Sequence, residues 1–257
     1  MRMSHSRIET FKKCPYQFKL RYVDGLRTVF NLEPTNALAL GTAMHEGIEK
    51  DVESAIHSYY SNYPTATQLM VNEAIKLEVM VGKAKEVLSD LLATGRFEVA
   101  IEHPDFIGFI DLLVPVEGEQ DVYDIYDFKY SNNVEHYLES SQLHLYRYFF
   151  ERCNPGVRVR NLAFIFIPKV KLKQETEDIR EYRRLLKEEC EKQKINIVPI
   201  EYDPNKVIDF MLDAKHCIEC EDFDKKTQKL CYFCDYKTYC ASDGKLDGMI
   251  IYPKEDE

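Results

Sequence analysis

The chain has 257 residues, of which 45% are hydrophobic, and a formal net charge of −10. This length suits one domain, or one domain with an appendage, and the hydrophobic content is enough for a packed core. The sequence has no run of about 18 apolar residues and no apolar signal-peptide core, so we expect a soluble, cytoplasmic protein without a membrane-spanning helix.

The charge is distributed unevenly along the chain. Between Glu98 and Glu139 there are eleven acidic residues and one basic residue, whereas residues 1–30 carry seven basic and two acidic residues. A second basic run follows later, at Lys169, Lys171 and Lys173. This distribution is compatible with a bound divalent cation and with contacts to phosphates, although an ordinary acidic protein with solvated charged faces has the same composition.

Hydrophobic periodicity predicts alternating helices and strands. In chain order, we predict helices at residues 6–22, which Pro15 should kink or divide in two, and at 36–62, 66–93, 137–152, 176–193 and 204–217. We predict strands at residues 97–101, 108–116, 122–129, 157–168 and 195–202. This order favours an α/β fold in which helices flank a mixed central sheet. The organisation would be a helical region at 1–95, a core at 96–202, and a cysteine-rich C-terminal region at 203–257 whose last four residues are disordered.

Charged residues interrupt two of the predicted strands. The strands at 108–116 and 122–129 flank a short polar break with a glycine, which predicts a β-hairpin. Asp111 lies inside the first strand, and Asp127 and Lys129 close the second. Alternation with period two puts Asp127 and Lys129 on one face of their strand. Because an unpaired buried charge is costly, such groups are paired or hold a metal ion.

Four further segments carry distinctive patterns. They are Ser6 to Phe18 with a Cys14-Pro15 pair, Gly41 to His45, Gln142 to Tyr146, and Cys231-x2-Cys234-x5-Cys240. Gln142 and Tyr146 are four residues apart in a predicted helix and therefore share one face. Each segment also has an ordinary explanation: His45 as a satisfied helix histidine, Cys14 as a small core residue, and Gln142 as part of an amphipathic helix.

Together with Asp111 and Asp127-Phe128-Lys129, these segments resemble the PD-(D/E)xK nuclease superfamily. Within it they resemble the RecB-like branch, which includes the exonucleases of CRISPR adaptation and AddB-type nuclease domains. The segments occur in the family's order and span nearly the whole chain. The resemblance implies a restriction-endonuclease-like core in one nuclease domain over residues 1–257. It also implies a metal-dependent DNA exonuclease, often on single-stranded DNA, with a place in recombination, repair or DNA processing.

The resemblance also implies a set of metal ligands. Asp111, Asp127 and the carbonyl of Phe128 would hold one or two Mg²⁺ or Mn²⁺ ions, and His45 would complete the site. Neutral imidazole suits Mn²⁺ better than Mg²⁺. Such ions lower the pKa of a bound water and stabilise charge that develops on the phosphate and the leaving oxygen.

Three further residues receive catalytic roles from the resemblance. Lys129 would position or activate the attacking water and stabilise the transition state. Lysine suits this role because its ammonium group is a compact point charge. Gln142 and Tyr146 would orient Lys129 or contact the DNA backbone.

The chain contains eight cysteines, which allow two kinds of metal site. On spacing alone, two Cys-x2-Cys pairs make a credible zinc site: Cys217, Cys220, Cys231 and Cys234. Four thiolates can also hold a [4Fe–4S] cluster. The family resemblance implies that its ligands would be Cys14, Cys231, Cys234 and Cys240. The resemblance favours the cluster, which would join the N-terminal helix to the C-terminal region.

Two other functions remain compatible with the sequence. A DNA-binding or recombination-accessory module could share the fold without catalysis, although here all the catalytic positions are filled. A zinc-stabilised interaction protein is the third interpretation. Helicase motors carry a Gly-x4-Gly-Lys-Ser/Thr phosphate loop, and the sequence has none. A nuclease of this kind would therefore work alone or with a helicase or another processing protein.

Overall fold

The computed structural model describes residues 1–245 and 248–253, and the chain divides into two compact units. The larger unit comprises Leu32–Glu102 and Gly108–Asp203, and the smaller unit comprises Met1–Asn31, His103–Ile107 and the residues from Pro204 onward. The chain thus passes between the units four times. The tail that we predicted to be disordered, residues 254–257, lies outside the described residues.

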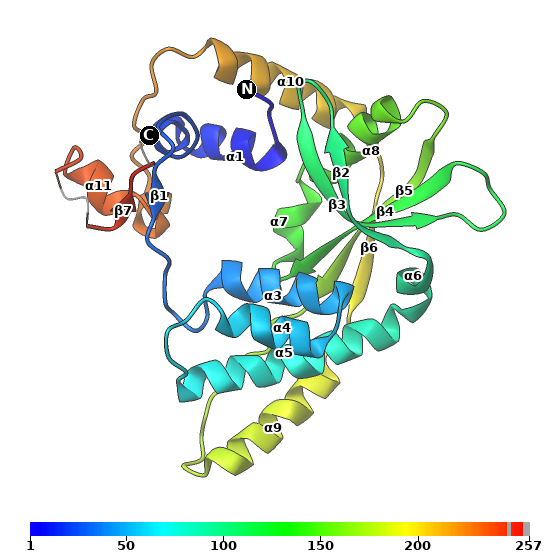
Figure 1. Cartoon of the computed structure of the whole chain (residues 1–257), viewed down its shortest axis with the longest axis vertical. Helices are drawn as coiled ribbons and strands as arrows, with labels where there is room; N and C mark the ends of the chain where they lie inside the picture. The colour runs from blue at the N-terminus through cyan, green and yellow to red at the C-terminus, as the bar shows by residue number, and fades with distance from the viewer. Residues whose placement is uncertain (246–247, 254–257) are drawn as a thin grey trace. The chain divides into compact units, whose positions relative to one another are not determined.

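A five-stranded mixed sheet forms the centre of the larger unit (Figure 1). In spatial order its strands are β2 (Arg96–Glu102), β3 (Ile107–Pro115), β4 (Val122–Tyr130), β5 (Arg158–Ile167) and β6 (Asn196–Ile200). β3 and β4 are antiparallel, β4 and β5 are parallel, and β5 and β6 are antiparallel. The predicted mixed sheet and the predicted hairpin are both confirmed.

Two helices contact β4, the strand that carries Asp127 and Lys129. They are α3 (Ala37–Glu49) and α8 (Gln142–Cys153), and the short helix α7 (Val134–Leu138) precedes α8. The ring of Phe128 packs against His45 of α3, whereas Asp127 and Lys129 bond to Gln142 of α8. The ring of Phe128 thus faces α3, whereas the side chains of Asp127 and Lys129 contact α8.

The helical region differs from the prediction in its helix boundaries. The predicted helix at 36–62 is two helices, α3 and α4 (Val52–Tyr60), because the Asp51 side chain accepts a hydrogen bond from the Ser54 amide at 2.7 Å and caps a new helix. The predicted helix at 66–93 likewise divides at Leu88 into α5 (Gln68–Val87) and α6 (Ser89–Thr94).

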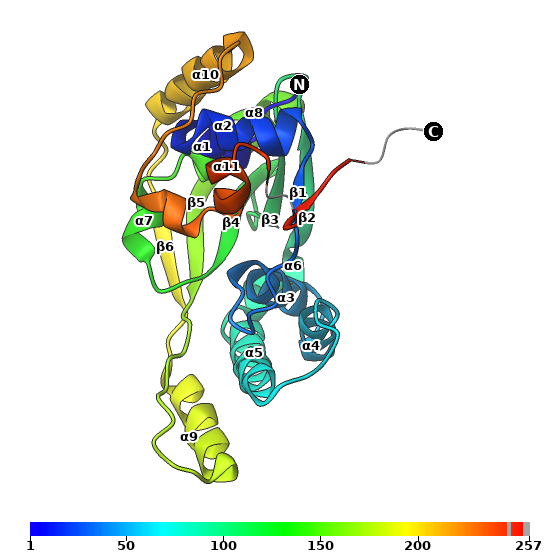
Figure 2. The ribbon, with the colours of Figure 1, turned by 90° about the vertical axis from the view of Figure 1, so that its left-hand side faces the viewer.

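The helices α3, α4 and α5 form one group, as both ribbon views show (Figure 2). Gly47 of α3 is the point of closest approach. A Cβ atom added there would lie 2.7 Å from Ala55 of α4 and 2.8 Å from Val81 of α5, which is too close for any larger residue. α9 (Ile179–Lys192) contacts α5, and its Arg183 donates to Asn72 at 3.2 Å. This group places α3 firmly beside the sheet.

The smaller unit consists of short elements from both ends of the chain. They are α1 (His5–Lys13), α2 (Pro15–Phe18), the π-helix η1 (Lys19–Val23), β1 (Arg27–Thr28), α10 (Pro204–Glu219), the 3₁₀-helix η2 (Lys229–Phe233), α11 (Lys237–Ala241) and β7 (Ile250–Ile251). The predicted break at Pro15 is confirmed, since α1 ends at Lys13 and α2 begins at Pro15. The helix itself begins earlier than Ser6, because Ser4 caps α1.

Contacts between sequence-distant segments hold the smaller unit together. β1 pairs with β7, and Lys12 of α1 lies 3.2 Å from a carboxylate oxygen of Asp213 in α10. One small hydrophobic cluster of this unit consists of Leu20, Leu26, Tyr236 and Ile250. In the part of the chain that the structure describes, no helix combines the length and apolar character that a membrane crossing requires.

Candidate active site and cysteine centre

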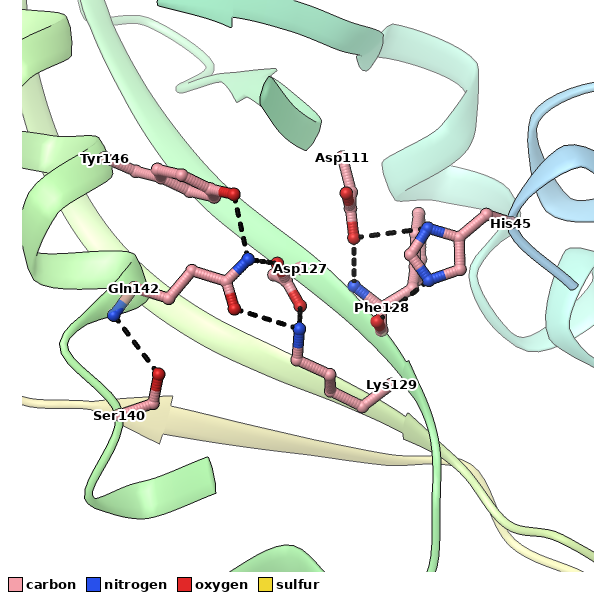
Figure 3. A network of polar contacts seen from close by, with 8 residues as sticks. All are labelled: His45, Asp111, Asp127, Phe128, Lys129, Ser140, Gln142 and Tyr146. Atoms are coloured by element: carbon pink, nitrogen blue, oxygen red, sulfur yellow. Dashed lines mark hydrogen bonds and ion pairs between the residues drawn. The ribbon is translucent and has the colours of Figure 1, made fainter. Parts of the chain in front are cut away.

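Asp111 projects from β3 and holds the backbone of β4. Its Oδ2 accepts a hydrogen bond from the Phe128 amide at 2.8 Å and lies 3.5 Å from Nδ1 of His45 (Figure 3). Burial, followed by the neighbouring charge of Asp127, raises the pKa of Asp111 well above its usual range. A nearby cation would offset that cost and restore the ionised carboxylate.

His45 comes from the middle of α3 and points at the same strand. Its Nε2 lies 3.0 Å from the carbonyl oxygen of Phe128, and its Nδ1 faces Asp111. Burial lowers the pKa of the imidazole, which favours the neutral form that ligates metal ions. When Nε2 donates to the carbonyl, Nδ1 is left with a bare lone pair facing a carboxylate oxygen.

Gln142 connects the other half of the site, on the α8 side of β4. Its Nε2 donates to Asp127 Oδ1 at 2.8 Å and lies 2.8 Å from the hydroxyl oxygen of Tyr146, while its Oε1 accepts from Lys129 Nζ at 3.0 Å (Figure 3). Ser140 Oγ accepts a hydrogen bond from the backbone amide of Gln142 at 3.2 Å. The predicted pair Gln142 and Tyr146 therefore shares a face and contacts both Asp127 and Lys129.

Lys129 is buried among charges and aromatic rings. Burial lowers the pKa of its ammonium group, but the charges of Asp127 and Asp111 outweigh this effect and raise the pKa above its ordinary value. Its Nζ forms an ion pair with Asp127 and lies 5.2 Å and 5.4 Å from the ring centroids of Tyr137 and Phe164. Lys129 is thus held protonated and in one position.

The amino-acid sequence of the chain matches a known protein family. The family model of the PD-(D/E)XK nuclease superfamily matches residues 2–241, which include every residue of the network above. The chain belongs to the PD-(D/E)XK nuclease superfamily. Members of this superfamily are metal-dependent nucleases that act on DNA, and the chain shares that general chemistry.

Other comparisons add little to the family assignment. No curated protein sequence matches the chain. Nine chains of solved structures match it. One is the crystal structure described as "Putative exonuclease" from Eubacterium rectale, with 11% identity, a TM-score of 0.45, and coverage of 89% of this chain and 91% of the other.

Glu98 is a candidate ligand of this PD-(D/E)XK nuclease that the sequence analysis missed. Ligand atoms of His45, Glu98 and Asp111 all lie within 4.8 Å of one another. Burial, and then the charges of Glu49 and Asp127, raise the pKa of Glu98. Its backbone has a φ of 48°, a left-handed conformation that is costly for any residue except glycine. A strained carboxylate beside a histidine and an aspartate is typical of a functional site.

We tested whether these residues suit a divalent cation. Asp127 is 1% exposed, and among the described residues its Oδ2 has only the ammonium group of Lys129 as a partner. A bound cation stabilises a buried carboxylate with so few partners, and the free lone pair of His45 Nδ1 is a suitable metal ligand. The donor set of carboxylates, a carbonyl and imidazole therefore fits Mg²⁺ or Mn²⁺.

A hollow of about 540 Å³ lies beside His45 and Glu98. Its walls come mainly from the start and middle of α3, including Gly41 and Thr42 of the Gly41-to-His45 segment. No atom lies within 4 Å of a Cβ added at Gly41, so the small residue leaves open space there. This hollow gives His45 and Glu98 access to solvent.

The cysteines of the smaller unit separate into two groups. Cys14, Cys231, Cys234 and Cys240 all line one cavity of about 1170 Å³, whereas Cys217 and Cys220 do not. Burial raises the pKa of the Cys234 and Cys240 thiols, and the charges of Cys14 and Cys231 raise both further. Burial and the neighbouring Cys220 raise the pKa of Cys217 to about 11. The structure thus gathers the four cysteines that the family resemblance selects.

Local structure explains how this cysteine group arises. Cys14 is the extended residue between α1 and α2, Cys231 lies in η2, Cys234 follows its end, and Cys240 lies in α11. Gln228 donates to the carbonyl of Lys13 at 2.7 Å, which ties the C-terminal segment beside Cys14. No three cysteine sulfurs among the described residues lie within 4.8 Å of one another, whereas a tetrahedral zinc site brings its sulfurs to about 3.8 Å.

Proposed function

We propose that this protein is a divalent-metal-dependent DNA exonuclease of the RecB-like branch, with a cytoplasmic role in DNA recombination, repair or processing. One observation carries the proposal: α3, β3, β4 and α8 bring polar residues of the three family segments in the larger unit into one network around β4. Asp111, Asp127 and Lys129 share this network with His45 and Gln142. An accessory module without catalysis would have no need of such a complete set.

The proposed metal ligands are His45, Asp111, Asp127, the carbonyl of Phe128 and, in addition, Glu98. When bound, Mg²⁺ or Mn²⁺ supplies positive charge that lowers the pKa of water and stabilises the phosphate in the transition state. The raised pKa values of Asp111 and Glu98 and the bare lone pair of His45 all mark positions where a cation lowers the energy.

Lys129 acts on the attacking water and on the phosphate. Its raised pKa keeps the ammonium group protonated at neutral pH, so its role is to donate hydrogen bonds and positive charge rather than to remove a proton. The ion pair with Asp127 and the hydrogen bond to Gln142 occupy two of its three donors. The third donor remains for the water or a phosphate oxygen.

Gln142 and Tyr146 are positioning residues in this proposal. The side-chain amide of Gln142 holds the Asp127–Lys129 ion pair in place, because it donates to Asp127 and accepts from Lys129. Burial raises the pKa of Tyr146 far above neutrality, so its hydroxyl stays neutral and holds the Gln142 amide in one orientation. The RecB-like resemblance further implies action on single-stranded DNA or on DNA ends, with a separate helicase where duplex must be unwound.

We also propose a [4Fe–4S] cluster on Cys14, Cys231, Cys234 and Cys240. One observation supports the cluster over zinc: these four cysteines line one cavity without Cys217 and Cys220. The cluster would stabilise the short helices of the smaller unit.

A cleavage assay tests the nuclease. Protein purified without oxygen is incubated with end-labelled linear single-stranded, linear duplex and circular DNA, with Mg²⁺, with Mn²⁺ and with neither. We expect metal-dependent loss of linear DNA and survival of circles. Lys129→Ala should lose cleavage by about 1,000-fold or more.

The matched control is Lys76→Ala, which removes an equally buried lysine from a buried ion pair outside the site. The side chains of Lys76 and Glu73 are 13% and 11% exposed, against 15% and 1% for Lys129 and Asp127. Cleavage by Lys129→Ala at the rate of Lys76→Ala would overturn the proposed role. No cleavage by folded wild-type protein would favour the accessory module.

A further inference from the structure

We propose that Tyr232 and Phe233 form a stacking platform for two unpaired bases of single-stranded DNA. The inference rests on the proposed nuclease function and refines its substrate class. The two side chains belong to η2, in the smaller unit, next to Cys231 and Cys234. They take no part in the metal network of the larger unit.

The two rings are unusually exposed for side chains of their size. Tyr232 is 73% exposed and Phe233 is 79% exposed, and the preceding Leu230 is 53% exposed. Large aromatic side chains normally account for much of a protein's buried apolar surface. Two consecutive exposed rings beside a cavity therefore indicate a surface that contacts a ligand.

The surroundings of the rings are basic, although the chain as a whole carries a net charge of −10. The cavity that they line also contains five lysines and one carboxylate: Lys13, Lys225, Lys226, Lys229, Lys237 and Asp243. Asp243 forms an ion pair with Lys225. Among the described residues, no carboxylate pairs with Lys13, Lys229 or Lys237. The local excess of positive charge selects a polyanion.

The ring geometry favours separate bases over a stacked duplex. The centroids of Tyr232 and Phe233 are 5.1 Å apart, and the ring planes make an angle of 84°. Bases stacked on both rings would therefore be perpendicular to each other, which the parallel bases of a duplex do not allow. Lys237 Nζ lies over one face of the Tyr232 ring, 4.7 Å from its centroid, so a base would stack on the other face with a positive charge close to its phosphate. Aromatic rings with interleaved lysines are the usual platform for single strands.

The experiment separates base stacking from charge and from catalysis. Binding of a fluorescent oligothymidylate of about 15 nucleotides is measured without added divalent cation, in the Lys129→Ala background. The same measurement uses an abasic oligomer of equal length, which keeps the phosphates and lacks the bases. The variants are Tyr232→Leu with Phe233→Leu, which removes the rings but keeps apolar side chains, and Tyr232→Trp with Phe233→Trp, which keeps the rings. Leu230→Ala is the control for an exposed apolar neighbour.

We expect the double leucine variant to bind oligothymidylate about 30-fold or more weakly, because each stacked base contributes about 1–3 kcal/mol. Binding of the abasic oligomer should be the same in both proteins, and the double tryptophan variant and Leu230→Ala should bind as the parent does. Since the sequence has no tryptophan, the tryptophan variant also reports stacking directly through quenching of its fluorescence.

Three results would overturn the inference. They are unchanged binding by the leucine variant, an equal loss for the abasic oligomer, and a fall in thermal stability that accompanies the loss, which would make the rings structural. The nuclease proposal is judged by cleavage and this one by binding, so the two fail separately. A protein that binds single strands through the rings but does not cut them would support the stacking platform and contradict the nuclease proposal.

Discussion

The active site of the larger unit and the cysteine centre of the smaller unit are built in opposite ways. The active-site residues project from long strands and helices, and they hydrogen-bond to one another without help from any ion. Cys231, Cys234 and Cys240 lie in or directly after elements of five residues, and Cys14 lies between α1 and α2. Long elements thus position the candidate active-site residues, whereas short elements position the proposed cysteine ligands.

The difference separates two roles that metals have in proteins. In the larger unit a metal ion would add chemistry to a fold that already exists. In the smaller unit a metal centre would join short segments that are far apart in the sequence. Substitutions at the two sites should therefore have different consequences, one for activity and the other for folding.

The largest effect should follow from the loss of Cys14. Cys14→Ser removes one of four thiolates, and because structural metal centres contribute about 10 kcal/mol to folding, we expect the smaller unit to unfold and iron to be lost. Iron content, visible absorption and circular dichroism measure this. Cys217→Ala is the control: this cysteine is buried in the same unit and lies outside the cavity. Loss of metal in Cys217→Ala, with iron absent from the wild type, would restore the zinc interpretation.

The next effect should appear at Asp111. Asp111→Asn keeps an acceptor for the Phe128 amide but removes a ligand charge, so we expect cleavage to fall by about 1,000-fold. Thermal unfolding without metal should show the reverse, with the variant more stable than the wild type at neutral pH. A less stable variant would mean that the charge of Asp111 is satisfied within the protein.

The sign follows from the raised pKa of Asp111. The folded protein keeps a proton on this carboxyl that the unfolded chain releases near the ordinary pKa of 3.8. The wild-type stability from the neutral carboxyl is therefore complete below that pH and is lost as pH rises toward the folded-state pKa. The stability difference between Asp111→Asn and wild type should grow over this range and shrink when Mg²⁺ is added.

A smaller effect should follow at Gln142. Gln142→Leu removes the side-chain amide that contacts both Asp127 and Lys129. We expect kcat to fall by about 10- to 100-fold, while cleavage still requires a metal ion. Tyr146→Phe removes only the hydroxyl next to the amide and should cost less than Gln142→Leu. Steady-state cleavage of a labelled single strand compares them. Equal losses in both variants would make the tyrosine, rather than the glutamine, the positioning residue.

The smallest effect should come from Glu98. Glu98→Gly relieves the left-handed backbone, so we expect a gain of about 1 kcal/mol in the free energy of unfolding together with lower activity. Glu98→Gln keeps the strained backbone and removes only the charge, so it should lose activity without the gain. Chemical denaturation measures both. A Glu98→Gly protein less stable than Glu98→Gln would contradict the assignment of strain.

The sequence was sufficient to predict the sheet and most of the network. Asp111, Asp127 and Lys129 are conspicuous because each interrupts an apolar strand, and that signal survives without any structure. Gln142 and Tyr146 were predicted from helical spacing together with the family resemblance. In the structure Gln142 contacts Lys129, and Tyr146 contacts Gln142. Their catalytic roles stay predictions.

Two features were beyond sequence reasoning for physical reasons. Glu98 escaped because it lies near the start of an exposed strand where a glutamate is ordinary, and only its φ of 48° and its neighbours distinguish it. The breaks at Asp51 and Leu88 escaped because apolar periodicity runs through both positions. Local capping by the Asp51 side chain overrides that pattern.

The order of the cysteines along the chain has a consequence for biosynthesis. Cys14 precedes the whole of the larger unit, and its three partners follow it. At a synthesis rate of about 5–20 residues per second, Cys14 would wait about 10–40 s for them on the ribosome. A chain released early could therefore fold its nuclease network but never close its cysteine centre. If the proposed cluster forms, only molecules whose translation has passed Cys240 would be able to bind it.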